Sequence, residues 1–480
     1  MNRERKPRTT GTRKVQVFKG PQRKSPELVT TAGQKNFSHA KALPQHALHL
    51  EKLLPELLRF EQPSDRVVSR YFRAEPRLGN RDRALIAESA FAILRRKNEI
   101  AQFAVSGSGP QARRLALLGM MSALSEGGLG SAQRFESALA DLAFVLQPGE
   151  LEWLQRYVHL ERESLGPMVR NNLPEWLWLA FAKYPGEDQR EALAQALMKP
   201  APLDLRANTI KITRTDLMEQ INANESRYKA VVTPYAPDGL RIIGKPSLQN
   251  TTWFKEGFLE VQDEGSQMLC YLVSPKRGEM VVDFCAGAGG KTLAMGAMMR
   301  STGRLYAFDT SARRLANLKP RQARSGLSNV HPVWIDSEND PKIKRLAGKI
   351  DRVLVDAPCS GIGTLRRNPD LKWRQTPEAV TELNLKQTHI LNSAARLLKP
   401  GGRLVYATCS LLPSENQEIA QQFLKNHPEF EVLPASEALK GYFLHGEMPI
   451  GCSVDNPWWQ LWPHLHGTDG FFGAIFVRKP

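Results

Sequence analysis

Two cysteines are the residues of this chain with the clearest chemistry. Cys359 lies in the segment Asp356–Ser360 (DAPCS), and Cys409 lies in the segment Ala407–Ser410 (ATCS). A thiolate is a strong nucleophile, and a second thiol close to it can act as an acid or a base. The pair therefore indicates covalent catalysis in two steps, provided that the fold brings the two segments together.

Each cysteine follows an apolar run of the kind that forms a buried strand. Arg352–Val355 precedes the first cysteine, and Arg403–Tyr406 precedes the second. In an open α/β sheet, ligands bind in the crevice beyond the carboxyl ends of the strands. We therefore expect both thiols at one crevice, close to any cofactor bound there.

The chain alternates between strand and helix patterns from about residue 257 onward. We expect strands at residues 281–284, 304–309, 330–336, 351–356 and 403–408, with helices between several of them. This alternation is typical of a doubly wound, mostly parallel sheet. A further apolar run at residues 471–477 is expected to be an edge strand.

A glycine-rich loop follows the first of these strands. It comprises Cys285, Ala286, Gly287, Ala288, Gly289, Gly290 and Lys291. Glycines let the backbone turn tightly and approach a ligand closely. Cys285 stands where a P-loop needs its first glycine, and Thr292 stands where a dinucleotide fingerprint needs its last. S-adenosylmethionine, a nucleoside without phosphates, therefore fits this loop better than NAD.

Acidic residues end the next two expected strands. Asp309 can hold the two ribose hydroxyls of a nucleoside, and Asp336 can reach an adenine edge. Either carboxylate alone could instead cap a strand end or a helix. Together with the glycine loop they indicate a nucleoside site, in which Lys291 either contacts the bound molecule or faces the solvent.

Composition and charge narrow the class of protein. The chain has 480 residues and a formal net charge of +17 at pH 7, which indicates a polyanionic partner such as a nucleic acid. Its five cysteines form no CxxC and no cluster with histidine at metal spacing, so we expect neither a disulfide scaffold nor a metal site. Without an apolar signal sequence or membrane-spanning run, we expect a cytoplasmic monomer.

We expect four regions along the chain. Residues 1–38 are basic and poor in apolar residues, so they form a disordered tail, either solubilising or binding phosphates. Residues 39–160 have helical periodicity, with a kink or break at Pro55. Residues 161–256 form a small α+β module, and residues 257–480 hold the large sheet. The module's expected elements are strands at 203–206 and 240–243 and a helix at 213–222.

These segments together resemble a known family. The chain is similar to the NOP/Sun family of RNA cytosine-5 methyltransferases, and most of all to the bacterial 16S rRNA enzymes. The matching segments are the glycine loop and residues 205–208, 261–264, 356–361, 366–373, 406–410, 415–416 and 469–472. The resemblance covers about residues 40 to 480. It implies a Rossmann-like methyltransferase domain preceded by a NusB-like helical domain and a small α+β RNA-binding module.

The resemblance also implies a reaction, the methylation of cytosine C5 in rRNA with S-adenosylmethionine through a covalent Cys–C6 adduct. It implies Cys409 as the nucleophile and Cys359 as the group that assists proton removal and release. Asp356 would contact the base and the methyl donor. The reverse assignment of the cysteines stays open, because DNA cytosine-5 methyltransferases use a Pro-Cys nucleophile, which here would be Cys359.

A mixture of cations and an aromatic ring indicates where RNA would bind. Such a mixture suits phosphate contact and base stacking. The candidates are Arg206, Asn208, Arg366, Arg367, Lys372 and Trp373. Alternatively, the first two cap a strand end and the others belong to a solvated loop.

Two other functions stay open from the sequence. One is a tRNA methyltransferase of the same family, which the sequence does not separate from an rRNA enzyme. The other is a catalytically silent RNA-binding assembly factor. The presence of both cysteines and of the strand-end acids argues against the silent factor.

Overall fold

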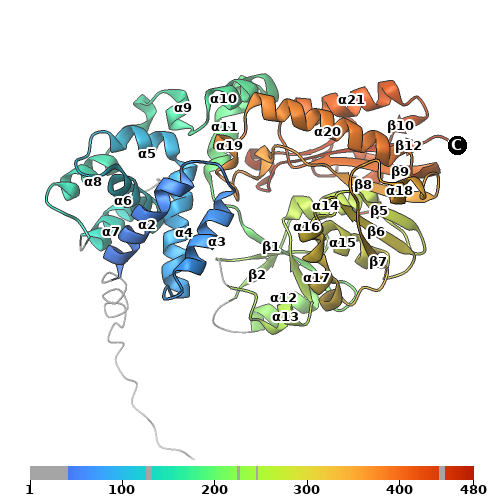
Figure 1. The fold of residues 1–480 in the computed structure, drawn as a ribbon, viewed down its shortest axis with the longest axis horizontal. Coiled ribbons are helices and arrows are strands. Elements are labelled where there is room, and N and C mark those ends of the chain that lie inside the picture. The colour runs from blue at the N-terminus through green and yellow to red at the C-terminus, as the bar shows by residue number, and fades with distance from the viewer. Residues whose placement is uncertain are drawn as a thin grey trace, which may run out of the picture.

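The structure, a computed structural model, describes most of the chain beyond residue 41. The described residues are 42–125, 132–143, 145–223, 228–244, 247–442, 449–453 and 455–480. The expected basic tail, residues 1–38, lies outside them. The described chain forms a group of helices, a small sheet and a larger sheet flanked by helices (Figure 1).

The N-terminal part is a bundle of helices around one apolar core. Its helices are α2 Leu43–Leu57, α3 Ser64–Ala74, α4 Asn80–Arg95, α5 Lys97–Ala104, α6 Gln111–Leu124, α7 Ala132–Leu142 and α8 Glu150–Val158. Apolar residues at three- and four-residue spacing give each helix a stripe to bury. Of the kink or break expected at Pro55, the break is wrong, because α2 continues to Leu57 and the burial of Leu53, Leu54 and Leu57 holds its last turn, while the kink stays a prediction.

Three helices lead from the bundle to the first sheet. They are α9 Pro167–Arg170, α10 Glu175–Phe181 and α11 Glu187–Met198, with short turns η1 Arg162–Ser164 and η2 Ala182–Gly186 between helices. Leu177 and Phe181 pack with Ile362, Leu411 and Leu412, which follow the two candidate cysteines in sequence. This packing supports the backbone just beyond each cysteine.

The small sheet is antiparallel, with the strand order β2-β3-β1-β4. Its elements are β1 Leu203–Ala207, α12 Arg214–Ala223, β2 Ala230–Val232, β3 Gly239–Ile242, α13 Thr252–Lys255 and β4 Leu259–Val261. The strands expected at 203–206 and 240–243 and the helix expected at 213–222 are confirmed to within a residue at each end. Because β4 is an edge strand, it is free to face the catalytic domain.

The large sheet has the strand order β10-β12-β9-β8-β5-β6-β7, and β11 pairs with β12. Its strands are β5 Met280–Asp283, β6 Arg304–Asp309, β7 Val330–Trp334, β8 Ile350–Asp356, β9 Leu398–Thr408, β10 Phe430–Val432, β11 Trp459–Leu461 and β12 Phe471–Arg478. Pairs among β5 to β9 are parallel, and the pairs made by β12 are antiparallel. The expected doubly wound, mostly parallel sheet is therefore confirmed.

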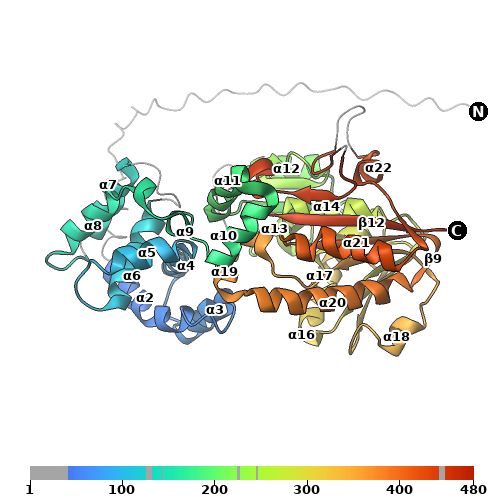
Figure 2. The same cartoon turned by 90° about the horizontal axis from the view of Figure 1, so that it is seen from above.

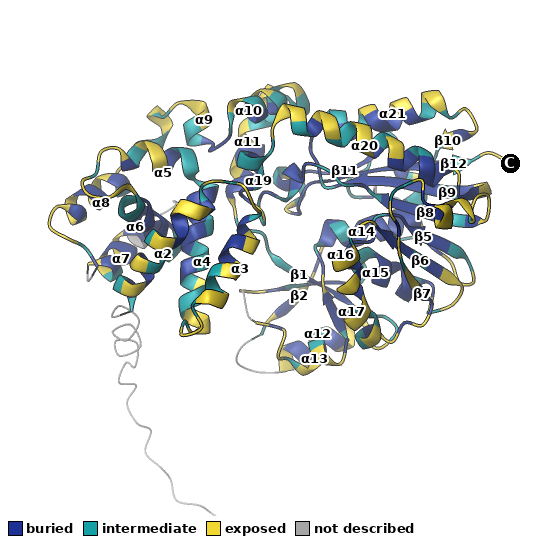
Figure 3. Ribbon diagram, in the orientation of Figure 1, coloured by how far each residue is buried: buried dark blue, intermediate teal, exposed yellow. Residues whose placement is uncertain are grey.

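Helices cover both faces of this sheet (Figures 1 and 2). The helices are α14 Glu264–Val273, α15 Gly290–Met298, α16 Ala312–Ala316, α17 Leu318–Ser325, α18 Pro341–Lys344, α19 Leu371–Arg374, α20 Pro377–Ala395, α21 Gln417–Asn426, α22 Ala435–Leu439 and α23 Pro463–His466, with turns η3 Ile362–Thr364 and η4 Pro413–Glu415. Neighbouring strand residues enter opposite cores: Val281 packs with α14 and α15, and Val282 packs with α20. The central strands are therefore buried on both faces, whereas the edge strand β7 is largely exposed (Figure 3).

Two strand predictions need correction. Residues 471–477 form β12, which lies between β9 and β10 rather than at an edge. Its two faces both meet cores, since Phe472 enters one and Ile475 enters the other. The strand expected to end at Asp336 ends at Trp334 instead, and Asp336 is exposed beyond it.

Candidate active site

Both candidate cysteines lie at the carboxyl ends of neighbouring parallel strands. Cys359 follows β8, Cys409 follows β9, and their Sγ atoms are 3.4 Å apart. A cavity of about 290 Å³ opens at this end of the sheet, and both cysteines line it. The fold thus brings the two thiols to one crevice, as the strand pattern indicates.

The buried residue Glu415 holds the two cysteine segments together. Its carboxylate accepts hydrogen bonds from the Ser360 N–H (2.8 Å) and from the hydroxyls of Ser360 and Ser410 (2.5 Å each). Gln387 donates to the same carboxylate at 3.0 Å. From the sequence, Glu415 is only part of the segment 415–416 that resembles the family. Nothing in the local pattern around it predicts that it is buried.

Gly363 brings a third segment to the same place. Its N–H donates to the Cys409 carbonyl (2.9 Å), and its own carbonyl accepts from the Gly470 N–H (2.8 Å). A Cβ at position 363 would lie 2.2 Å from the Gly470 carbonyl oxygen. The start of β12 can therefore lie this close to both cysteine segments only if residue 363 is glycine.

The Cys359 thiol is held in its protonated form. Its hydrogen bond with Cys409, followed by burial and the neighbouring charges of Cys409 and Glu415, raises the pKa of Cys359 well above its ordinary value. A protonated Cys359 can donate its S–H to the Cys409 sulfur. This arrangement suits one thiolate nucleophile beside one proton carrier.

Lys291 and Asp356 form an ion pair beside the thiols, with 2.7 Å between Nζ and Oδ2. Burial alone would lower the pKa of Lys291, but the charge and hydrogen bond of Asp356, together with the charges of Cys270 and Cys409, raise it above its ordinary value. Lys291 is therefore a cation that points into the protein rather than into solvent. A cation here stabilises negative charge that develops in the crevice.

The glycine loop lies at the end of β5, beside Asp309 at the end of β6. The Asp309 carboxylate accepts the N–H groups of Gly287 and Ser311, each at 2.7 Å. Gly287 and Gly289 have φ angles of +55° and +84°, which residues with a side chain rarely adopt. The loop residue Cys285 lines the cavity with Asp309 and Asp356.

Asp336 is not among the residues that line this cavity. Its N–H donates to the Asp340 carboxylate at 3.0 Å, and this bond belongs to the turn beyond β7. Ile335 and Glu338 line the cavity instead. Other lining residues that sequence reasoning missed are Phe284, Thr310, Arg314, Ala357, Pro358, Lys386 and Ile390. Ala357 and Pro358 belong to the segment that carries Cys359, whereas no motif marks the other five, which only the fold assembles.

The donor set fits a nucleoside ligand. Asp309 offers carboxylate oxygens for ribose hydroxyls, and the apolar side chains of Phe284 and Ile335 suit a flat base. Across the described residues, no group of three or more His, Cys, Asp or Glu could hold a metal ion. The helices of the described part of the chain include none that is long and apolar enough to cross a membrane.

Two of the candidate RNA-binding residues, Arg206 and Asn208, are buried within the protein. Arg206 donates from Nε to Gln262 at 2.8 Å. The Asn208 amide donates to the carbonyls of Gly257 (2.8 Å) and Ser325 (2.9 Å), so it joins the small sheet to α17. A contact between these side chains and RNA would require breaking these bonds, and it stays a prediction.

Arg366 and Arg367 bond to neighbouring segments of the chain. Arg366 donates to the Gly467 carbonyl at 2.7 Å. Arg367 bridges the carboxylates of Asp469 (2.5 Å) and Asp263 (2.8 Å). Both residues are half-buried and held by these bonds, so their part in RNA binding also stays a prediction.

Lys372 and Trp373 meet the helical bundle. The Lys372 Nζ donates to the Arg95 carbonyl at 2.8 Å, and the Trp373 indole N–H donates to the Leu94 carbonyl at 2.7 Å. Burial, followed by the charges of nearby arginines and Lys97, lowers the pKa of Lys372 well below its ordinary value. In this structure the two residues thus dock the bundle on the catalytic domain, and contact with RNA stays a prediction.

Comparisons with known proteins agree with this architecture. Residues 270–477 match the family described as 16S rRNA methyltransferase RsmB/F, and residues 173–249 match the ferredoxin-like domain of RsmF/B-like methyltransferases. The probable ribosomal RNA small subunit methyltransferase B of Synechocystis sp. is 30% identical over 445 residues, which cover 88% of this chain and 97% of the relative.

Solved structures share this fold. The crystal structure of PH0851 is 26% identical, with a TM-score of 0.69, and the match covers 90% of this chain and 98% of that one. NSun6 from Pyrococcus horikoshii with SFG is 21% identical, with a TM-score of 0.56 over 64% of this chain and 98% of that one. A helical region, a ferredoxin-like domain and a Rossmann-like methyltransferase sheet are therefore confirmed.

Proposed function

The chain belongs to the RsmB/F family of RNA methyltransferases, and on that premise we propose that it methylates carbon 5 of a cytosine in 16S rRNA. Cytosine C5 is too weakly nucleophilic to take a methyl group from a sulfonium unaided. The observation that carries the proposal is the pair of thiols 3.4 Å apart beside the strand-end cavity. That pair offers both a nucleophile for C6 and a carrier for the C5 proton.

Cys409 is the nucleophile in this proposal. Its thiolate adds to cytosine C6, and the electron density released makes C5 enamine-like. The Lys291 cation stabilises the thiolate before attack, and Asp356, held by Lys291, is within the cavity to contact the base. A base paired in RNA must first be unstacked, which costs a few kcal/mol.

S-adenosylmethionine supplies an electrophilic methyl group when it is bound. Cytosine C5 takes that methyl group, the C5 proton is then removed, and elimination of the Cys409 thiolate restores the ring. Cys359 assists these last two events because its sulfur lies against that of Cys409. It first releases its own proton to solvent, which is the one proton that the reaction yields overall, and its raised pKa then makes the ionised sulfur a strong acceptor for the C5 proton.

We assign the methyl donor to the cavity that the cysteines line. Asp309 would hold the ribose hydroxyls, the Cys285–Lys291 loop would surround the nucleoside, and Asp356 would lie between donor and base. Ile335 would contact the adenine rather than Asp336, because Ile335 lines the cavity. We also propose that the helical region ends near residue 160 and that the small module ends just after β4 Leu259–Val261, a few residues past the boundary expected at 256, because β4 pairs with β1 of its sheet.

The test is transfer of labelled methyl groups from S-adenosylmethionine to unmodified 16S rRNA, with bisulfite mapping of the product. We expect one 5-methylcytosine, absent when Cys409→Ala replaces the wild-type protein. Transfer to tRNA alone would contradict the choice of substrate. No transfer to rRNA, tRNA or ribosomal particles would contradict the enzyme itself and leave a silent RNA-binding factor.

A further inference from the structure

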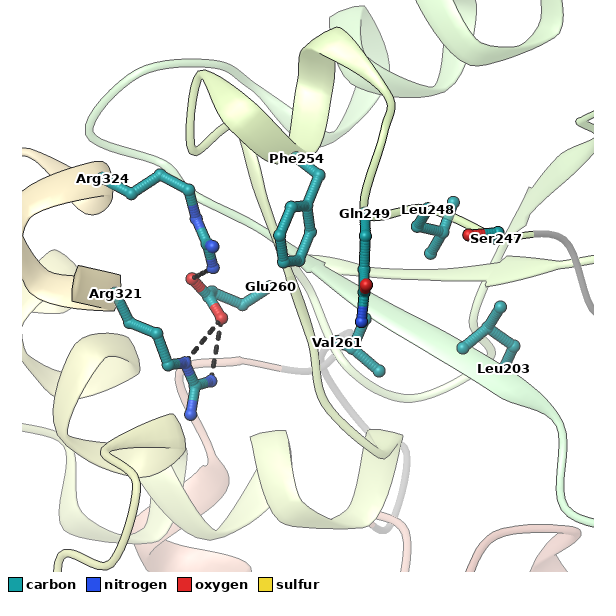
Figure 4. Close-up of a pocket in the computed structure, with 9 residues that line it drawn as sticks. All are labelled: Leu203, Ser247, Leu248, Gln249, Phe254, Glu260, Val261, Arg321 and Arg324. Carbon is teal, nitrogen blue, oxygen red and sulfur yellow. Dashed lines mark hydrogen bonds and ion pairs between the residues drawn. The ribbon is translucent and has the colours of Figure 1, made fainter. Parts of the chain in front are cut away.

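A second cleft lies where the ferredoxin-like domain meets the catalytic domain (Figure 4). At its charged end, Glu260 of the edge strand β4 faces Arg321 and Arg324 of α17. The Glu260 residue is only 4% exposed, so its charge depends on these two partners. The contact belongs to neither the cavity nor the thiol pair described above.

Arg321 makes two different kinds of bond with one guanidinium. Its Nε and Nη2 atoms donate to the Glu260 carboxylate, at 3.0 and 2.8 Å. Its Nη1 atom donates to the Ala288 carbonyl, at 2.7 Å. Arg321 therefore joins the ferredoxin-like domain directly to the glycine loop of the catalytic domain.

The bonded carbonyl belongs to the part of the loop in which glycines leave the backbone the most conformational freedom. Ala288 stands between Gly287 and Gly289, whose φ angles of +55° and +84° are positive. A backbone with two glycines has many alternative conformations, and each bond to its peptide groups removes some of them. The Gly287 N–H is fixed by Asp309 and the Gly289 N–H by the Ala286 carbonyl. Arg321 fixes the carbonyl between them.

Arg321 acts on the loop from outside the cavity, because it is not among the cavity's lining residues. Arg324 is a matched control for Arg321, because among the described residues it shares the bond to Glu260 but not the bond to the glycine loop. It also donates to Glu260, at 2.5 Å, and its guanidinium lies 4.0 Å from the centre of the Phe254 ring. No bond from Arg324 to the glycine loop occurs among the described residues.

We propose that Arg321 is a positioning residue for the methyl-donor loop and that Glu260 orients it. The affinity of the catalytic domain for S-adenosylmethionine then depends on its contact with the ferredoxin-like domain. This inference rests on the proposed function, since it takes the Cys285–Lys291 loop as the donor site. Arg321 does not touch the reacting atoms, and its effect is to hold the Ala288 peptide in one orientation.

The experiment measures binding of S-adenosylhomocysteine to the full-length protein by calorimetry. A charge-assisted hydrogen bond to the loop is lost in Arg321→Met, so we expect the Kd to rise about tenfold. Arg324→Met should leave the Kd within about twofold, because the loop keeps its bond. In methyl transfer, Arg321→Met should raise the KM for S-adenosylmethionine by a similar factor and leave kcat at saturating donor nearly unchanged.

Two results would overturn the inference: an unchanged Kd in Arg321→Met, or an equal loss in Arg324→Met, which would indicate a purely structural ion pair. Circular dichroism and thermal unfolding identify a variant that does not fold. In that case Glu260→Gln serves instead, and its Kd should rise about threefold because Arg321 loses its charged partner. An unchanged Kd there also overturns the inference. Failure of the wild-type protein to bind would instead contradict the proposed function, and the inference with it.

Discussion

Cys359 and Cys409 are chemically alike, yet their surroundings differ. Cys359 has its pKa raised by its bond to Cys409 and by burial, whereas Cys409 lies in the field of the Lys291 cation. A thiol that is held protonated is a poor nucleophile at neutral pH. The surroundings of Cys359 therefore agree with the assignment of Cys409 as the nucleophile.

We expect opposite effects from replacing each thiol. Cys409→Ala should abolish methylation and form no covalent RNA complex, because the C6 adduct cannot form. Cys359→Ala should accumulate such a complex, because proton removal and release are slowed after the adduct has formed. The measurement is a denaturing gel of labelled RNA after incubation with S-adenosylmethionine.

Cys452→Ala is the matched control for this pair, since Cys452 does not line the cavity. Its methylation should equal that of the wild-type protein, and no complex should accumulate. If the complex instead appears with Cys409→Ala and not with Cys359→Ala, the two roles are reversed.

Among the elements, the meeting of three segments at Gly363 is the tightest contact near the site. Gly363→Ala would place a methyl group 2.2 Å from the Gly470 carbonyl and 2.8 Å from that of Cys409. Both obstacles are backbone atoms, which cannot rotate away. We expect the free energy of unfolding, measured in urea, to fall by about 2 kcal/mol. Methyl transfer should fall by about a hundredfold, because the Cys409 segment is displaced.

Gly441→Ala is the control for the Gly363 variant, since among the described residues no atom beyond the chain neighbours of Gly441 lies within 4 Å of the added methyl group. It should unfold at the same urea concentration as the wild-type protein. A Gly363→Ala protein with wild-type stability and activity would mean that the β12 start can move away from the cysteine segments.

The elements that the sequence predicted well are those whose pattern is local. The central strands of the parallel sheet are buried on both faces, and such strands appear as continuous apolar runs that are easy to locate. The same pattern predicts an interior position for β12, because apolar and polar residues do not alternate along Phe471–Val477. Glu415 gave no such signal, since the three residues that donate to its carboxylate come from loops and a helix that meet only in the folded chain.

On the scale of the whole molecule, the segment 366–373 docks the helical bundle. Trp373 and Lys372 donate to carbonyls at the end of α4, and Asp370 accepts the Ser64 N–H at the start of α3 (3.2 Å). Cations and an aromatic ring in a loop are also what an RNA contact requires, so the sequence alone cannot separate the two roles. The residues to which Lys372 and Trp373 donate lie almost three hundred residues earlier in the chain. No local sequence pattern could therefore predict these contacts.

Lys372 makes this docking dependent on pH. The pKa of Lys372 is lowered in the folded protein, so the folded state releases the Lys372 proton at a lower pH than the unfolded chain does. The unfolded chain keeps that proton up to about pH 10.4. Between the lowered pKa and that value the unfolded state binds more protons, so the contribution of Lys372 to stability rises with pH.

Lys372→Met removes this titration while keeping a long side chain. The free energy of unfolding of the wild-type protein minus that of the variant should therefore increase from pH 7 to pH 10. At pH 7 the variant should be at least as stable, because an apolar side chain replaces a group that is costly to bury. Urea unfolding at each pH gives the difference, and Lys319→Met, at an exposed position on α17, controls for loss of a lysine. If the free energies of unfolding of the wild-type protein and Lys372→Met change with pH in the same way, burial does not lower the pKa of Lys372. The docking of the bundle would then be independent of pH.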